Sequence, residues 1–524
     1  MSQQLKAALE RFSLPEFRTA WGQINRGIEK ESLRVDRDGH LTQTPHPDAL
    51  GSALTHPYIT TDYSEALIEL ITPVSGRIDD TLDLLTDLHK YVYHHLPDGE
   101  LLWTSSMPCL VGGDKQIPLA HYGSSNIGRL KTLYREGLGH RYGRLMQTIA
   151  GIHYNFSMPE VFWEEYRELL GSTESLQDFR TRQYLHLIRN FHRHSWLLLY
   201  LFGASPAVCR CFTRGRQHSL DDFDEATLYR PHATCLRMGN LGYRSDAQRS
   251  IFVCYNDLDT YIDTLHRAMS TPYGPYEAIG LKAGDRFLQM NTNLLQLENE
   301  FYATIRPKRA DDSGRRPLEV LKAEGIQYIE VRALDLNPFL PLGIDARQMR
   351  FLDTFLLHCL LADSPECTRE EYFEVESNLA RTVTEGRNPE LTLKRGGQDV
   401  ALRAWAGELV ADMQHSAALL DSAHGTGEYS AAVSTQVDKV MDASLTPSAR
   451  ILEAMRRDQQ SFFRFAYQQS IKARDWCRAS PLEPQRFEHF TAAGKESLSD
   501  QTSLEQSDTL AFDDFLQDYN RLQF

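Results

Sequence analysis

The stretch GIEKESLRV, residues 27–35, is the one from which the fold class follows. It reads as a β-strand, and side chains on a strand point alternately to its two faces, so Glu29 and Glu31 project to the same side. The segment therefore predicts a sheet with an acidic face.

Two further stretches, GIHYNFSM at 151–158 and GIQYIEVRAL at 325–334, alternate in the same way. Their polar faces carry His153, Asn155 and Ser157 in the first, and Tyr328, Glu330 and Arg332 in the second. An open antiparallel sheet can turn one face to water, so each polar face taken alone also fits a solvent face. The concentration of Glu, His and Arg favours a shared cavity.

A fourth stretch, TTDYSEALIELITP at 60–73, places Asp62 and Glu69 seven residues apart. If the stretch is a helix, that spacing puts both carboxylates on one face of it. Alternatively, a loop carries Asp62 into a strand that holds Glu69. The β-branched end of the stretch favours the second arrangement, and the sequence leaves both open.

These side chains form a hard, oxygen-rich set with one imidazole, which suits Mg²⁺ or Mn²⁺. The candidate metal ligands are Glu29, Glu31, Asp62, Glu69, His153 and Glu330. Carboxylates gathered in one cavity repel each other unless cations neutralise them, so we expect more than one ion. Arg332 and the basic run 306–309 add positive charge, a combination that suits phosphoryl transfer from a nucleotide.

Aromatic residues beside polar ones suggest a second, smaller substrate pocket. Its candidates are Tyr63, Tyr134, Arg135, Arg237, Tyr243 and Tyr302. We expect Tyr134 and Arg135 to lie on a helix that runs toward Gln147. Motifs for Walker and Rossmann nucleotide sites, GxSxG and HExxH are absent from the sequence, so any ATP would be held by metals and a sheet-lined cavity.

Composition excludes several classes. Of 524 residues, 41% are hydrophobic, which is enough for a large core, and the net charge of −15 gives no general affinity for nucleic acid or an anionic membrane. The longest apolar run, 196–204, is far shorter than the roughly 20 residues of a transmembrane helix. We expect a soluble, cytoplasmic protein. Eight cysteines are too few for a disulfide scaffold, and we expect Cys209 and Cys211 to be ordinary thiols.

The chain is expected to form a single catalytic body. A sheet-rich core spans about 20–340, and a helical part spans about 345–490, with core-facing helices at 348–362 and 400–420. A polar, Ser-rich tail follows at about 494–524.

Eight blocks in order resemble the proteobacterial glutamate–cysteine ligases (γ-glutamylcysteine synthetases, type 1) over about residues 22–355. They are RGIEKESLRV, LGSALTHPYITTDYSEALIELITP, SSMPC, YGSSNIGRLKTLYREGL, RYGRLMQTIAGIHYNFS, YLFGASPAVC, LQMNTNLLQLENEFYATIRPKR and YIEVRALDLNPF. Each block alone is weak, but eight in order are very specific.

The resemblance implies an α+β fold with a glutamine-synthetase-like antiparallel sheet, curved into a funnel and flanked by helices. It implies ligation of the glutamate γ-carboxylate to the cysteine amine with ATP and Mg²⁺, the first step of glutathione synthesis. Small molecules would be its partners, and we expect a monomer.

Position by position, the resemblance assigns the six candidate ligands to metal and makes Arg332, beside Glu330, the phosphate-contacting arginine of the catalytic centre. It assigns Tyr63, Tyr134, Arg135, Gln147, Arg237, Tyr243 and Tyr302 to substrate binding. Tyr63 stands where members of the family have Phe.

Three other functions remain open from the sequence: a related carboxylate–amine ligase with another acceptor, a metal-dependent hydrolase, and a catalytically inactive binding protein. The intact ligand set on four segments argues against the last. Arg332 and the basic run argue for a nucleotide rather than for simple hydrolysis.

Overall fold

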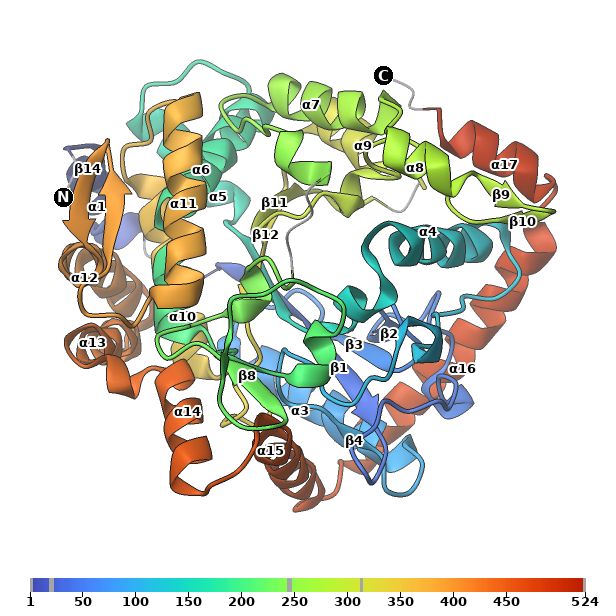
Figure 1. The fold of residues 1–524 in the computed structure, drawn as a ribbon. Helices are drawn as coiled ribbons and strands as arrows, with labels where there is room; N and C mark the ends of the chain where they lie inside the picture. The colour runs from blue at the N-terminus through green and yellow to red at the C-terminus, as the bar shows by residue number, and fades with distance from the viewer. Residues whose placement is uncertain (1–2, 18–22, 243–246, 312–313, 522–524) are drawn as a thin grey trace.

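A seven-stranded, wholly antiparallel sheet lies at the centre of the computed structural model, which describes residues 3–17, 23–242, 247–311 and 314–521 (Figure 1). The strand order is β11-β12-β5-β1-β3-β2, and β4 pairs with one end of β1. The strands are β1 (Asn25–Val35), β2 (Ile59–Thr61), β3 (Leu67–Ile71), β4 (Leu101–Leu102), β5 (Ile152–Ser157), β11 (Ile305–Lys308) and β12 (Tyr328–Leu334). The three strands expected from alternation are confirmed as β1, β5 and β12.

Strand β1 is the axis of this sheet, since it pairs with β3, β4 and β5. Its register sets Glu29 opposite His153 and Glu31 opposite Glu69. The segment at 60–73 forms strand β2, a loop and strand β3, so the loop-and-strand alternative is correct.

Helices cover the other face of the sheet. Tyr154 on β5 donates a hydrogen bond to Asp353 on α10 (Ala346–Leu361), and Lys30 on β1 contacts His89 on α3 (Ile78–His95). These residues alternate with those of the acidic face, so one face is packed and the other is left for a site. The remaining N-terminal helices are α1 (Gln3–Phe12), α4 (Asn126–Tyr142), α5 (Glu160–Leu169), α6 (Leu176–Phe202), α7 (Leu258–Ser270), α8 (Gly274–Ile279) and α9 (Pro317–Glu324).

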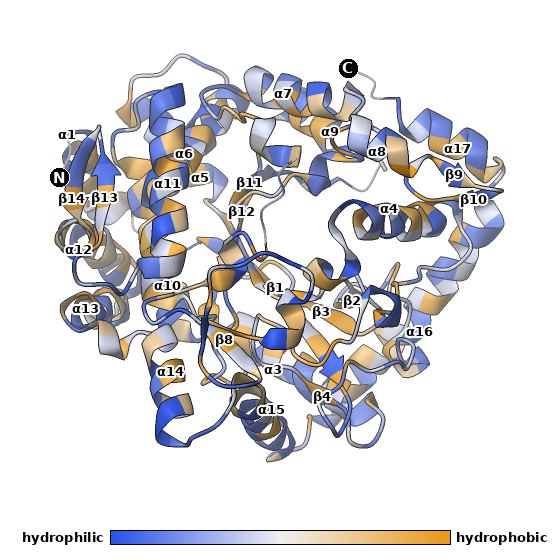
Figure 2. Ribbon diagram, viewed as in Figure 1, coloured by the Kyte–Doolittle hydropathy of each residue, from blue (hydrophilic) through white to orange (hydrophobic). Residues whose placement is uncertain are grey.

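The part of the chain after 345 is mainly helical, as expected. Its helices after α10 are α11 (Arg369–Glu385), α12 (Leu402–His424), α13 (Glu428–Met441), α14 (Pro447–Arg457), α15 (Phe462–Arg478), α16 (Pro484–Ser507) and α17 (Phe512–Tyr519). One hairpin, β13 (Thr392–Arg395) and β14 (Gln398–Ala401), interrupts the series and includes Val400. In Figure 2, α11 alternates between hydrophilic and hydrophobic residues, the pattern of a helix half turned to water.

The change of composition at Gly494 falls inside α16 and does not mark the end of a helix. Small sheets lie outside the main one: β6 (Ala207–Cys209), β7 (Asp221–Asp222) and β8 (Thr227–Tyr229) form one, and β9 (Lys282–Ala283) and β10 (Arg286–Phe287) form another. No helix among the described residues has both the length and the apolar character needed to cross a bilayer.

One expectation about the cysteines is wrong. Cys209 is bonded to Cys109, although 100 residues separate them, while Cys211 is free as expected. Folding brings β6 beside the segment after β4, a proximity that local sequence spacing does not contain.

A buried ion pair ties β1 to α10 across the packed face. Arg26 Nε lies 2.7 Å from Asp353 Oδ2, and both side chains are almost fully buried. We expect Asp353→Ala to lower the free energy of unfolding by about 3–5 kcal/mol, since it leaves a buried guanidinium without its counter-charge. The double variant Arg26→Met, Asp353→Leu should lose less free energy of unfolding than Arg26→Met and Asp353→Leu lose in sum as single variants. Urea unfolding followed by circular dichroism measures both, and additive losses would contradict this account.

Candidate active site

The acidic face of the sheet forms the floor of a pocket, and α4 lies across it from β11 and β12 (Figure 1). The pocket is lined by all six candidate metal ligands, namely Glu29, Glu31, Asp62, Glu69, His153 and Glu330. These residues come from four strands and from the loop after β2. The structure therefore brings together every carboxylate that the sequence singled out.

Three of these residues form the tightest group. Ligand atoms of Glu29, Glu69 and His153 all lie within 4.8 Å of one another. Two ligands on opposite sides of a Mg²⁺ ion would lie about 4.2 Å apart, so the group fits Mg²⁺ or Mn²⁺ with little movement. His153 Nδ1 lies 3.0 Å from Glu29 Oε2, and Asn155 donates a hydrogen bond to the other Glu29 oxygen.

The carboxylates are held at an electrostatic cost. Burial, together with the charges of Glu29, Asp62 and Glu31, raises the pKa of Glu69 well above its usual range. Burial also raises the pKa of Glu31, whose carboxylate accepts a hydrogen bond from the backbone N–H of Gly151. Nearby cations such as Arg332 do not outweigh this crowding at Glu69 and Glu31, and it is the arrangement that a bound cation relieves.

Basic residues gather at the β11–β12 side. Arg332 Nη1 lies 3.1 Å from Glu330 Oε2, and Lys308 Nζ lies 3.6 Å from the other oxygen. Burial works against the charged form of Glu330, but Lys308 and Arg332 outweigh it and hold its pKa well below the usual range. Negative and positive groups thus share one pocket, as the binding of a metal–phosphate ligand requires.

Five of the seven predicted substrate residues line the same pocket: Tyr63, Tyr134, Arg135, Gln147 and Tyr302. Tyr134 and Arg135 lie on α4 as expected, and Arg135 Nε donates a hydrogen bond to the backbone oxygen of Asp62. Gln147 lies in the short helical turn after α4 and donates to the Tyr302 hydroxyl over 3.0 Å.

The other two predicted substrate residues differ from these. Arg237 is fully buried behind the pocket wall, where it donates to the backbone oxygen of Arg332 and lies 3.9 Å from Asp335. It therefore holds the strand that carries Arg332. Tyr243 lies outside the residues that the structure describes.

Sequence analysis missed several pocket residues. Lys131 precedes Arg135 by four positions, a helical spacing that places both on one face of α4. In the basic run 306–309, Arg306 and Lys308 face the pocket, whereas Arg309 pairs with Glu324. The two-residue alternation of a strand would have separated Arg306 and Lys308, which share a face, from Arg309. Tyr519 of α17 also lines the pocket, and no local signal marks it.

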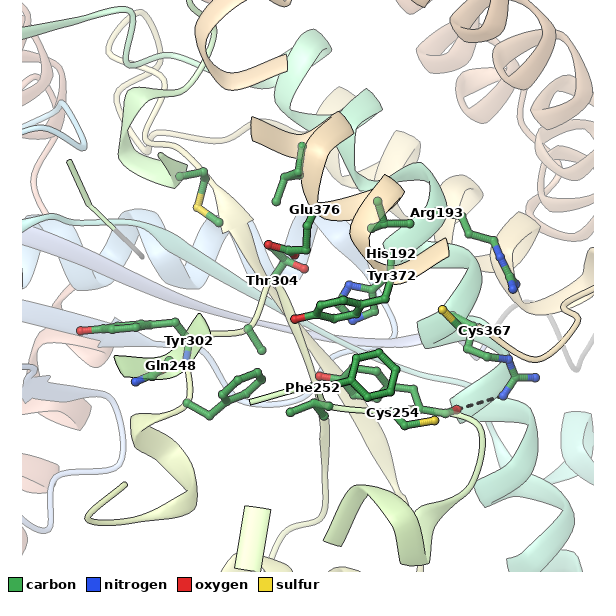
Figure 3. Close-up of a pocket in the computed structure, with 18 residues that line it drawn as sticks. His192, Arg193, Gln248, Phe252, Cys254, Tyr302, Thr304, Cys367, Tyr372 and Glu376 are labelled. Atoms are coloured by element: carbon green, nitrogen blue, oxygen red, sulfur yellow. Dashed lines mark hydrogen bonds between the residues drawn. The ribbon is translucent and has the colours of Figure 1, made fainter. Parts of the chain in front are cut away.

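A second pocket adjoins the first through Tyr302 (Figure 3). Tyr302 and Gln248 lie at one end, Arg193 and Cys367 at the other, and Phe252 and Tyr372 between them. Arg193 is already paired with Glu371. Among the described residues that line this second pocket, there is none of the six candidate metal ligands.

Comparison with known proteins points to one family. The family model for glutamate–cysteine ligase matches residues 9–382. The glutamate–cysteine ligase of Alcanivorax borkumensis is 50% identical over 95% of each chain, and that of Azotobacter vinelandii is 52% identical over 94% of this chain and 93% of its own. The solved structure of glutamate–cysteine ligase from Francisella tularensis in complex with AMP matches with a TM-score of 0.89 at 34% identity, over 95% of this chain and 97% of its own.

The fold and the similarity together define the class: the chain is a ligase with an antiparallel sheet flanked by helices, as expected from the sequence. More narrowly, it belongs to the glutamate–cysteine ligase family.

Replacing Glu69 by Gln should separate metal binding from folding. The raised pKa of Glu69 means that its charged form destabilises the metal-free fold, so removing the charge should stabilise that fold near pH 7. The same change should weaken the apparent affinity for Mg²⁺ and abolish most activity. Thermal unfolding with and without Mg²⁺, beside a Mg²⁺ titration of activity, measures both effects. A normal Mg²⁺ titration would refute the assignment of this ligand.

Tyr63 and Gly139 form a coupled pair in the pocket wall. The Tyr63 side chain is 1% exposed, its hydroxyl has no hydrogen-bond partner among the described residues, and a Cβ at Gly139 on α4 would lie 2.5 Å from that oxygen. We expect Tyr63→Phe to keep stability and activity, since it removes only an unsatisfied hydroxyl.

In that Phe background, Gly139→Ala should gain at most about 1 kcal/mol of helix stability, because the Arg144 side chain, whose Cγ lies 3.0 Å from the new Cβ, must still shift. In the parent protein, overlap with the hydroxyl should cancel the gain. A double-mutant cycle in urea measures the coupling, and strict additivity would rule it out.

Proposed function

We propose that this chain joins the γ-carboxylate of glutamate to the amine of cysteine, with ATP converted to ADP and phosphate. The product is γ-glutamylcysteine, and the reaction is the first step of glutathione synthesis. The observation that carries the proposal is the pocket in which Glu29, Glu69 and His153 face Lys308 and Arg332. The names of the relatives, glutamate–cysteine ligases, support glutamate and cysteine as the substrates.

A carboxylate resists attack by an amine, because its oxygen is a very poor leaving group. Transfer of the ATP γ-phosphoryl group to the glutamate side chain turns that oxygen into part of a phosphate, which leaves readily. The amine then attacks the acyl carbon, and phosphate departs. Arg332 and Lys308 are placed to stabilise the negative charge of the transferring group.

Glu29, Glu31, Asp62, Glu69, His153 and Glu330 are the residues that would hold Mg²⁺ or Mn²⁺, in more than one ion. Bound metal supplies positive charge at the nucleotide phosphates. Neutral imidazole donates to metal without balancing its charge, so His153 would set geometry more than charge.

Residues of α4 and its neighbours would hold the amino acids. Arg135 offers a cation for a carboxylate, while Tyr134, Gln147 and Tyr302 offer hydrogen bonds. The buried ring of Tyr63 offers an apolar wall for the cysteine thiol. Arg237 would act behind them, through the strand that carries Arg332.

We propose a monomer as the working unit. Its partners would be glutamate, cysteine and ATP, and we place the enzyme in the cytoplasm, where these metabolites occur together. Release of ADP that requires both amino acids tests the reaction. ADP release without cysteine would favour the hydrolase, and release with another amine alone would favour the related ligase.

The acyl-phosphate route predicts a specific transfer of oxygen. With glutamate that carries ¹⁸O in its γ-carboxylate, one labelled oxygen should appear in the released phosphate for each peptide formed, because that oxygen leaves with the phosphoryl group. Mass spectrometry of the phosphate measures it, and a reaction with unlabelled glutamate in ¹⁸O-water is the control. Unlabelled phosphate, or label in AMP, would contradict the route.

A further inference from the structure

The C-terminal helix α17 reaches the active-site pocket. Among the described residues beyond Arg332, Tyr519 alone lines that pocket, at the side formed by Ile127 and Leu130 of α4 and by Leu297. Nearly 190 residues of chain separate Tyr519 from Arg332, so only the tertiary fold brings this ring to the pocket. In Figure 1, α17 lies beside β9 and β10, at the end of the chain.

A small hydrophobic cluster fastens α17 to α4. Its buried members are Leu130, Leu133, Met290, Phe512 and Leu516. The guanidinium of Arg129 also lies over the Phe512 ring, 4.0 Å from its centre. This cluster is separate from the main core, so α4 depends on α17 for much of its local packing.

Polar contacts fix the start of α4 to the end of α16 and to the loop that leads into α17. Asp508 accepts a hydrogen bond from the backbone N–H of Asn126, and Glu505 accepts one from that of Ser124. The Asn126 side chain donates to the backbone oxygen of Leu510. The first N–H groups of a helix lack partners within it, so Asp508 satisfies one that would otherwise need water.

The far end of α17 is anchored to segments other than α4. Asn520 donates to the backbone oxygen of Met290, and Arg316 donates to the backbone oxygen of Tyr519 while its guanidinium lies 5.3 Å from the centre of the Tyr519 ring. Arg316 is paired in turn with Glu298, beside the pocket residue Leu297. Tyr519 is therefore held between the hydrophobic cluster on α4 and Arg316.

We propose that α17 is a working part of the active site, which clamps α4 in place and supplies Tyr519 to the wall that receives the amino-acid substrates. This inference rests on the proposed function for the identity of those substrates. The pocket face of α4 carries Lys131, Tyr134 and Arg135, whereas the candidate metal and phosphate groups lie mainly on the strands. Loosening α17 should consequently weaken amino-acid binding and leave the binding of Mg²⁺ and nucleotide unchanged.

The test compares Tyr519→Ala and Phe512→Ala with a control in the full-length chain, Gln517→Ala, which changes an exposed residue of the same helix. In both alanine variants, the KM of at least one amino-acid substrate should rise about tenfold, while kcat and the Kd for Mg²⁺–ATP stay within about twofold. The Gln517→Ala control should behave as the parent protein does.

A second measurement keeps the clamp falsifiable if Phe512→Ala folds poorly. Amide hydrogen exchange across residues 126–142 should quicken in Tyr519→Ala and Phe512→Ala, and the strands of the main sheet should keep their protection. Unchanged KM values in both alanine variants would overturn the proposal, as would equal loss of nucleotide binding and sheet protection. Failure of the parent protein to form γ-glutamylcysteine would instead overturn the proposed function.

Discussion

The constraint on which the site depends is the crowding of carboxylates on one face of a buried sheet. Antiparallel register sets Glu31 directly opposite Glu69 and Glu29 opposite His153, so these side chains start from neighbouring positions on one face of the sheet. Their mutual repulsion and burial disfavour the charged state of Glu69. The rest of the fold holds that arrangement in place until a cation neutralises it, since the opposite face of the sheet is locked to α3 and α10.

Positive charge is concentrated at one side of the sheet. Lys308 and Arg332 lie on the two strands at one side of the sheet and keep Glu330 ionised, whereas at Glu69 burial and the neighbouring carboxylates outweigh the charge of Arg332. The pocket thus has a side where anionic oxygen is balanced by cations and a side where it is only partly balanced. A metal-bound nucleotide, with both negative phosphates and cations, complements this asymmetry.

The two walls of the pocket are built by different means. Strand-borne groups are positioned by backbone pairing, which is rigid and largely local to each ladder. Groups on α4 are positioned by side-chain packing, and much of that packing comes from the far end of the chain. Arg237 shows the same dependence on distant elements, since it supports Arg332 from behind instead of facing the pocket.

Much of the site was readable from the sequence, because strand periodicity is a local property. Alternation alone placed Glu29 with Glu31, and Glu330 with Arg332, and the choice of side chains indicated the hard metal ion; family resemblance then supplied the reaction. Tertiary structure decided what local spacing cannot carry. It paired Cys209 with Cys109, left Arg237 outside the pocket lining and brought Tyr519 into it. The physical reason is that periodicity sets the direction of a side chain relative to its own strand or helix, whereas its neighbours are set by packing between segments far apart in the chain.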